Sequence, residues 1–126
     1  DEKEVIQVVA DALGHPSAGV RQAAVMTLPA TEKTTARIIE RKVLTDSDVQ
    51  VKLAAMLALA DTPASTAAGQ ALAERALLDE SLRDPVLKDA LIAASATHAI
   101  PFINRLAGMI TKQNGSSAEA ITSLSG

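Results

Sequence analysis

Apolar residues recur at helical spacing along most of the chain and are separated by short polar turns. In the segment 2–13, for example, Ile6, Val9 and Leu13 fall on one face of a helix. This periodicity predicts seven helices. They comprise residues 2–13, a second helix ending near Pro29, a third from Thr31 to Val43, a fourth from Ser47 to Leu59, a fifth opened by Thr62 and Pro63, a sixth over Asp84–Ser95 and a seventh over His98–Thr111.

Three of these helices have recognisable start signals. Thr31 precedes the third helix and is a residue type that caps helix N-termini. The run 47–50, Ser-Asp-Val-Gln, matches the capping-box pattern at the start of the fourth helix. Asp84 followed by Pro85 indicates an N-cap and a first helical residue for the sixth helix.

An internal repeat organises the helices into pairs. Val20–Val25 recurs as Val51–Met56, 31 residues later. A further shift of 31 reaches Leu82, Arg83 and Leu87, although Pro85 then falls inside a helix. Helix pairs at this period cannot bury their apolar faces alone and therefore stack. The sequence predicts an all-α fold, a right-handed α-solenoid of antiparallel helix pairs with three to four repeats, rather than a bundle with a heptad period.

The repeat predicts which residues are buried and where the domain ends. We expect burial between consecutive pairs for Val20, Ala24, Leu28, Val51, Ala55, Leu59, Leu87 and Leu91. The seventh helix is expected to bury Ile100, Ile103, Leu106 and Ile110. The repeat domain covers residues 1–113, and the small, polar segment 114–126 is expected to be a mobile or weakly docked tail.

The composition of the chain argues against several classes of function. Hydrophobic residues make up 48% of the chain but aromatic residues only 1%, with Phe102 alone. The net charge of −3 and the lack of aromatic stacking platforms argue against nucleic-acid binding. The chain has no Cys for a disulfide or a thiolate site. Its longest apolar run, Leu53–Ala60, is too short to span a bilayer, so no membrane insertion is expected.

The segment 44–55, Leu-Thr-Asp-Ser-Asp-Val-Gln-Val-Lys-Leu-Ala-Ala, resembles HEAT-like repeats of the short bacterial kind. Segment 15–24 keeps the Val-Arg-x-x-Ala part of the pattern but lacks the acidic turn. The resemblance extends to about Ile110 and implies a HEAT- or armadillo-like superhelix.

A narrower likeness concerns the segments 51–59, 71–77 and 79–84, which are similar to the HEAT region of large bacterial haem-binding, dehydrogenase-like proteins. This likeness implies a spacer and docking module in a periplasmic oxidoreductase, whereas without it a cytoplasmic location is expected. The haem-attachment motif Cys-x-x-Cys-His is absent. Because the chain begins with Asp1, we expect it to be part of a longer protein.

Basic residues occupy equivalent positions at Arg21, Lys52 and Arg83. When the repeats stack, such residues form a row that can bind an acidic partner. The favoured interpretation is instead that each forms a bond with an acidic turn of its own or the adjacent repeat. His15 and His98 lie far apart and are interpreted as turn or cap residues rather than metal ligands. No catalytic, metal-binding or cofactor-binding residues are assigned, and no cofactor is expected.

The sequence therefore favours a non-catalytic protein-interaction or scaffold module. Its partners would be another protein or flanking domains of the same chain. Gln22, Lys52 and Lys88, on the second helices of the pairs, are the predicted partner-binding residues on the inner face. The alternative is a small-ligand or enzyme role resembling HEAT-like bilin lyases, although such a pocket normally uses aromatic residues. HEAT-like DNA glycosylases fit less well because they need a cationic face.

Overall fold

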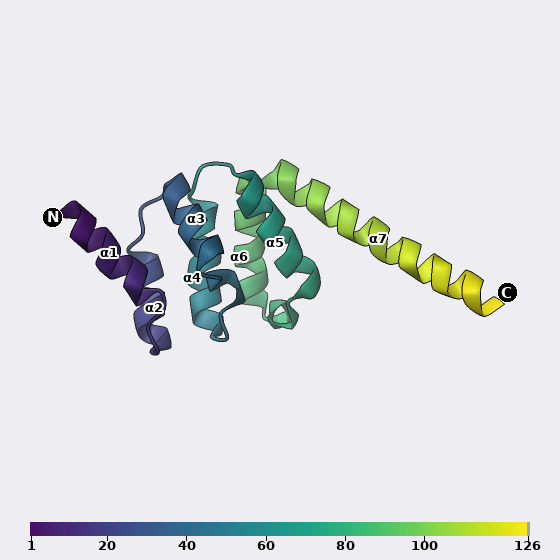
Figure 1. The fold of residues 1–126 in the computed structure, drawn as a ribbon, viewed down its shortest axis with the longest axis horizontal. Coiled ribbons are helices and arrows are strands. Elements are labelled where there is room, and N and C mark those ends of the chain that lie inside the picture. The colour runs from purple at the N-terminus through teal and green to yellow at the C-terminus, as the bar shows by residue number, and fades with distance from the viewer. Residues whose placement is uncertain (126) are drawn as a thin grey trace.

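The computed structural model describes the backbone of residues 1–125 and the side chains of residues 1–115. The fold is all-helical over these residues, with seven α-helices as predicted (Figure 1). They are α1 (Glu2–Ala12), α2 (Ala18–Met26), α3 (Glu32–Glu40), α4 (Val49–Ala60), α5 (Thr66–Leu78), α6 (Pro85–Thr97) and α7 (Ala99–Ser125), with 3₁₀ helices η1 (Val43–Thr45) and η2 (Glu80–Arg83).

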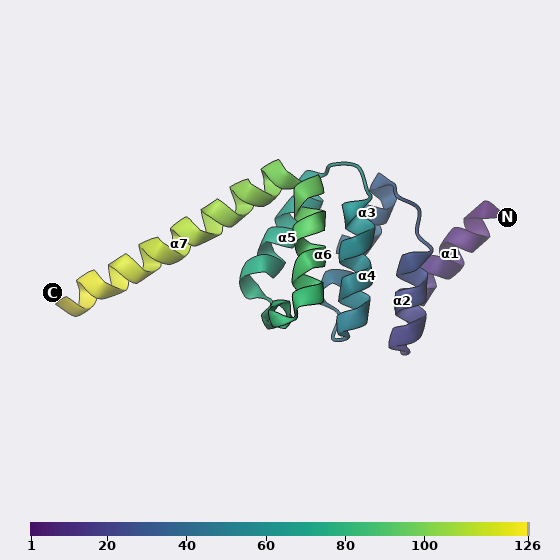
Figure 2. The ribbon, with the colours of Figure 1, turned by 180° about the vertical axis from the view of Figure 1, so that it is seen from behind.

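The first six helices form three consecutive pairs, α1 with α2, α3 with α4 and α5 with α6. The turns that lead into α2, α4 and α6 all lie at the same end of the molecule, the lower end in Figure 1. The second helices lie side by side, with α2 packed on α4 and α4 packed on α6, as Figure 2 shows. On the other layer α3 packs on α5, and α5 packs on α7. Each pair therefore contacts mainly its neighbours in sequence.

Side-chain caps fix where the helices begin. Thr31 accepts a hydrogen bond from the Thr34 amide, as predicted for the start of α3. Asp84 accepts from the amides of Val86 and Leu87, and Pro85 is the first residue of α6, again as predicted.

Two predicted helix starts are wrong. The N-cap of α4 is Asp48 rather than Ser47, because the Asp48 carboxylate accepts from both the Gln50 and Val51 amides. Helix α5 begins after Ser65 rather than at Thr62. The Thr62 hydroxyl instead donates to the carbonyl of Leu59, at the end of α4, which removes Thr62 from the capping role.

The third helix ends earlier than predicted. Lys42 adopts a left-handed conformation with φ of 56°, which a helix cannot continue through. Val43 therefore lies in η1 rather than in α3, where it is still buried.

Most of the predicted core is confirmed. The buried residues include Ala24, Val51, Ala55, Leu59, Leu87 and Leu91. The predictions for Val20 and Leu28 are wrong: Val20 is 37% exposed and Leu28 is only partly buried. Val20 belongs to the first pair, which has a neighbouring pair on one side only within the described chain, whereas Leu28 follows the end of α2 and lines an opening between α2 and α4.

The period of 31 holds for the first two pairs but not for the third. The N-caps Ser17 and Asp48 are 31 positions apart, whereas Asp48 and Asp84 are 36 positions apart. Leu82 and Arg83, the counterparts of Val51 and Lys52 at a further shift of 31, lie in η2 before α6. Counted from the N-caps, Lys88 of α6 stands at the position of Lys52.

Helix α7 approaches α5 closely at Gly69. A Cβ atom at Gly69 would lie 2.6 Å from Pro101 Cγ and 2.8 Å from both the His98 carbonyl oxygen and the Phe102 amide nitrogen. Two of these atoms are backbone, so only glycine permits this approach.

The predicted burial on α7 is wrong for three residues. Ile100, Ile103 and Ile110 are 75%, 60% and 42% exposed, and Leu106 is partly buried. The reason is that α7 packs on α5 with one face, and no described element covers its opposite face. Helix α7 continues through Ser125; the predicted weak docking of segment 114–126 concerns side chains that, from residue 116 on, lie outside the described residues.

We expect Leu59→Ala to lower the free energy of unfolding by about 2–5 kcal/mol, because it leaves a cavity beneath a fully buried side chain. Leu57→Ala is the matched control on the same helix; because Leu57 is 50% exposed, its loss should be under about 1 kcal/mol. Urea unfolding followed by circular dichroism measures both. Equal losses for the two variants would contradict the burial described above.

We expect Gly69→Ala to destabilise the protein by about 1–3 kcal/mol, because the added methyl group collides with the backbone of α7. Gly108→Ala, within α7, meets no atom within 4 Å. It should therefore stabilise the helix by about 0.5–1 kcal/mol through helix propensity alone. A stabilising Gly69→Ala would show that α5 and α7 do not pack as described.

Candidate functional site

Charged side chains connect successive helix pairs at the end where the turns lie. Arg21 of α2 forms a two-pronged bridge to Asp46, with Nε–Oδ2 and Nη2–Oδ1 distances of 2.8 and 3.0 Å. Its Nη1 also donates to the carbonyls of His15 and Pro16. Asp46 in turn accepts from the Asp48 amide at 2.9 Å. This carboxylate therefore holds α2 and organises the turn that starts α4.

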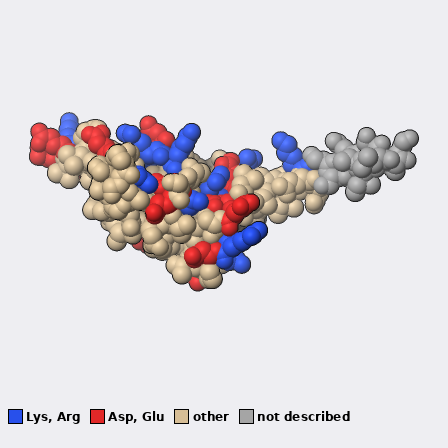
Figure 3. Space-filling view, turned by 90° about the horizontal axis from the view of Figure 1, so that it is seen from below, with Lys and Arg blue, Asp and Glu red and all other residues tan. Residues whose placement is uncertain are grey.

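Lys52 of α4 repeats this arrangement toward the third pair. Its Nζ lies 3.0 Å from Asp79 Oδ2 and 3.1 Å from Ser81 Oγ. Asp79 also accepts from the Ser81 amide. The side chains of Lys52 and Asp79 are only 13% and 6% exposed. Figure 3, seen from this end, shows basic and acidic side chains interspersed rather than gathered into a patch of one sign.

We refer to Arg21–Asp46 and Lys52–Asp79 as the inter-pair bridges. They confirm the structural interpretation of Arg21 and Lys52, since each bonds an acidic turn of the adjacent pair. Arg83 does not continue the series, because it is exposed in η2 and forms no salt bridge with a described residue.

The inter-pair bridges shift the titration of their groups. The hydrogen bond from Arg21 holds the pKa of Asp46 below its usual value, and the same bond raises the pKa of Arg21. For Asp79, burial acts to raise the pKa of the carboxyl, but the bonds from Ser81 and Lys52 outweigh it and lower the pKa. Both carboxyl groups therefore hold their negative charge to a lower pH in the folded protein than in the unfolded chain.

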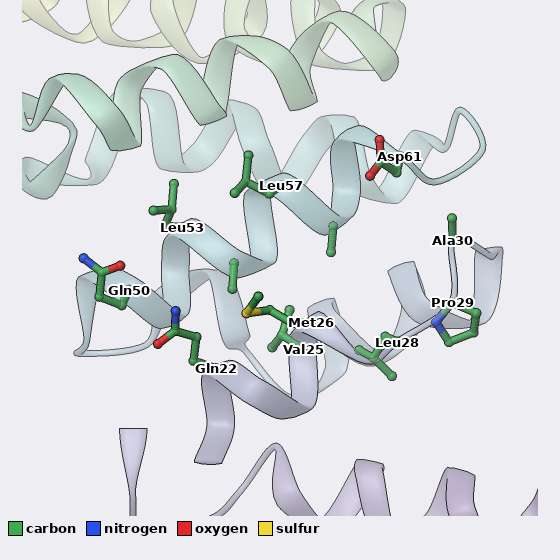
Figure 4. Close-up of a pocket in the computed structure, with 12 residues that line it drawn as sticks. Gln22, Val25, Met26, Leu28, Pro29, Ala30, Gln50, Leu53, Leu57 and Asp61 are labelled. Carbon is green, nitrogen blue, oxygen red and sulfur yellow. The ribbon is translucent and has the colours of Figure 1, made fainter. Parts of the chain in front are cut away.

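A groove of about 320 Å³ opens between α2 and α4, and we refer to it as the α2–α4 groove (Figure 4). Its apolar lining includes Val25, Met26 and Leu28 on one side and Leu53 and Leu57 on the other. Met26 is 72% and Leu57 is 50% exposed. Gln22, Gln50 and Asp61 also line it and supply polar groups. The groove offers apolar side chains to a partner, with a few hydrogen-bonding groups among them.

The structure does not bring the three predicted partner-binding residues together. Gln22 lines the α2–α4 groove. The Lys52 ammonium group is held in an inter-pair bridge, and Lys88 is exposed on α6. Sequence reasoning missed Met26 and Leu57. These two residues are 31 positions apart, so the repeat itself shows that both copies carry a large apolar residue there.

The two histidines serve the turns, as predicted. His15 accepts from the Ser17 amide through Nδ1. His98 is fully buried at the C-cap of α6, where its Nδ1 accepts from the Ser65 amide at 2.9 Å. Its Nε2 lies 2.8 Å from the Leu59 carbonyl oxygen, an acceptor only, so the proton resides on Nε2. His98 thus ties the start of α7 to the connection between α4 and α5.

Within residues 1–115, no group of three or more His, Cys, Asp or Glu side chains is placed to hold a metal ion. No single helix of the described chain is long and apolar enough to cross a membrane. Helix α6 and the first part of α7 meet that criterion only together, and they are bent by 112°.

No family model, no curated protein and no solved structure matches this chain. The HEAT-like resemblance therefore stays a prediction from sequence, and the function is argued from the geometry above.

The inter-pair bridges predict acid-sensitive stability. Because the folded pKa values of Asp46 and Asp79 are lowered, their contribution is present above the unfolded pKa, near 4. It is lost as the pH falls through the folded pKa. We expect the free energy of unfolding to drop as the pH falls below about 4. Urea titrations between about pH 2 and pH 7 measure this drop.

Asp79→Asn should lower stability by about 1.5–3 kcal/mol at neutral pH, because it removes charged hydrogen bonds to Lys52. It should also reduce the drop in the free energy of unfolding that occurs as the pH falls. Asp89→Asn, an exposed carboxylate on α6 outside the bridges, is the matched control and should leave the profile unchanged. An unaltered acid limb in Asp79→Asn would contradict this assignment.

Proposed function

We propose that the three helix pairs and α7 form a short, right-handed HEAT-like solenoid. Three observations support this arrangement. The second helices pack side by side in chain order, each pair has a side-chain cap at the start of its second helix, and the inter-pair bridges recur between successive pairs. In this proposal the chain contains three repeats, with α7 following the last.

We further propose that this solenoid is a non-catalytic module that binds a protein partner in the α2–α4 groove. The observation that carries the proposal is the exposure of Met26 and Leu57 between two packed helices. Large apolar side chains in a groove rimmed by polar groups are typical of surfaces that receive an amphipathic helix. Methionine suits this role because its flexible thioether adapts to the shape of the partner.

The polar lining indicates what such a helix would carry. Gln22 and Gln50 offer amide groups to the polar flank of a bound helix, and Asp61 offers a negative charge. We infer a partner helix with an aliphatic face and a basic residue next to Asp61. Aliphatic contacts contribute most of the affinity in such a site, because an exposed charge pair adds only about 0.2–1 kcal/mol.

The inter-pair bridges favour a second, compatible role as a spacer for flanking domains. Each bridge fixes one pair relative to the next through a largely buried charge pair. A row of pairs held in this way keeps its two ends at a constant separation. The groove and the spacer role use different surfaces of the same molecule.

Site-specific photo-crosslinking tests the groove. A photoreactive amino acid at position 57 should capture a discrete protein in cells of the source organism. The same group at position 8 is the matched control, because Val8 is 66% exposed on α1 and lies outside the groove. Met26→Glu should abolish capture from position 57 by placing a charge in the apolar lining. Circular dichroism confirms that the variant remains folded.

Equal capture from positions 8 and 57 would contradict groove binding. The small-ligand alternative predicts a different outcome. In that case the purified chain would change the visible absorbance of an added bilin, and Met26→Glu would remove the change. That result would show that the α2–α4 groove binds a pigment rather than a protein.

A further inference from the structure

Basic residues stand at one equivalent position in all three second helices. The fourth residue after each N-cap is Arg21 in α2, Lys52 in α4 and Lys88 in α6. Arg21 and Lys52 each reach an aspartate in the turn of the following pair. Lys88 is exposed and forms no salt bridge with any described residue. The third member of the series therefore lacks the partner that the first two have.

The residue one helical turn further on shows the same contrast. The eighth residues after the N-caps are Val25, Met56 and Ile92. Val25 and Met56 are 1% and 0% exposed, whereas Ile92 is 60% exposed. Residues four apart lie on one stripe of a helix, so Lys88 and Ile92 share a face of α6. We call this face the α6 end stripe.

The described chain does not cover the α6 end stripe. Helix α7 is bent by 112° relative to α6, packs on α5 rather than on α6, and runs away from the helix pairs toward its C-terminal end (Figure 1). A second copy of the chain fits poorly as well. In the turn before α2, the residue two positions before the N-cap Ser17 is His15. In the turn before α4, the residue two positions before the N-cap Asp48 is Asp46. In the third pair the bridging Asp79 lies five residues before the N-cap Asp84, and the residue five before Ser17 is Ala12. A second copy stacked in register would therefore bring a carboxylate to Lys88 from neither position.

We propose that the α6 end stripe binds a helix pair of a separate protein, whose turn presents an aspartate to Lys88 and whose apolar residues cover Ile92. The charge required of that partner follows from the inter-pair bridges, in which the same basic position meets an aspartate in both earlier pairs. This surface is separate from the α2–α4 groove and does not depend on the function proposed for it.

The chain itself supplies a probe for this chemistry. His15→Asp places a carboxylate where Asp46 stands in the second pair, so the variant carries a model of the proposed acidic turn. In sedimentation velocity, the His15→Asp chain should associate head to tail at least about tenfold more tightly than the wild-type chain. Adding Lys88→Glu should abolish that gain, and the pair His15→Lys with Lys88→Glu should restore it.

Lys112→Glu in the His15→Asp background is the matched control, because Lys112 is an exposed lysine on α7 away from the stripe. It should leave the association unchanged. His15→Asp chains that associate no more tightly than wild type, or equally tightly with Lys88→Glu, would overturn the proposal. Tight association of the wild-type chain that Lys88→Glu abolishes would show that a second copy, not a separate protein, occupies the stripe.

Discussion

In the second and third pairs, one carboxylate in the turn between the two helices accepts hydrogen bonds from two different parts of the chain. Asp46 accepts from the amide of Asp48, which shapes the turn before α4, and from the guanidinium group of Arg21 in the preceding pair. Asp79 does the same with the Ser81 amide and Lys52. The local turn and the long-range contact therefore form on the same carboxylate group and share its Oδ1 atom. The position of each pair relative to the next depends on this shared acceptor.

The inter-pair bridges contribute more to the alignment of these helices than they would in a core rich in aromatic residues. The buried surfaces of α4, α5 and α6 contain many small side chains, including Ala54, Ala55, Ala68, Ala73, Ala90 and Ala94. Small residues let helices approach closely, as α7 approaches α5 at Gly69. They also offer few protruding shapes that would oppose sliding of one helix along another. A charge pair with fixed geometry supplies the register that alanine surfaces do not.

Much of this fold can be predicted from sequence, and each part that cannot be predicted has a physical cause. Helix starts at Thr31 and Asp84 follow from local chemistry, because a cap needs only its own next few residues. The spacing of the third pair does not follow from the repeat, because η2 adds residues before α6, and α6 still packs on α4. The exposure of Val20 and Ile103 also escapes prediction. Their periodicity matches that of buried residues, and only the absence of a covering neighbour in the described chain leaves them in solvent.

The candidate site shows the same division between local and long-range information. Gln22 was predicted from its helix, and it lines the α2–α4 groove. Lys52 was predicted by the same argument, yet its charge is used in an inter-pair bridge. A partner for a basic residue depends on a turn 27 positions away, which helical periodicity does not specify.

The exposure of Ile92 has a different cause from the exposure of Met26 and Leu57. Ile92 occupies a position that is buried in both earlier pairs, so its exposure reflects a missing neighbour. Met26 and Leu57 differ, because they are exposed where both neighbouring helices, α2 and α4, are present and packed. Stacking between these pairs therefore does not account for their apolar character. In the third pair the equivalent position, nine residues after the N-cap, is Ala93, so a large apolar side chain stands at this position only in α2 and α4, where it lines the α2–α4 groove. This confinement is the physical reason to place binding there rather than along the whole row of second helices.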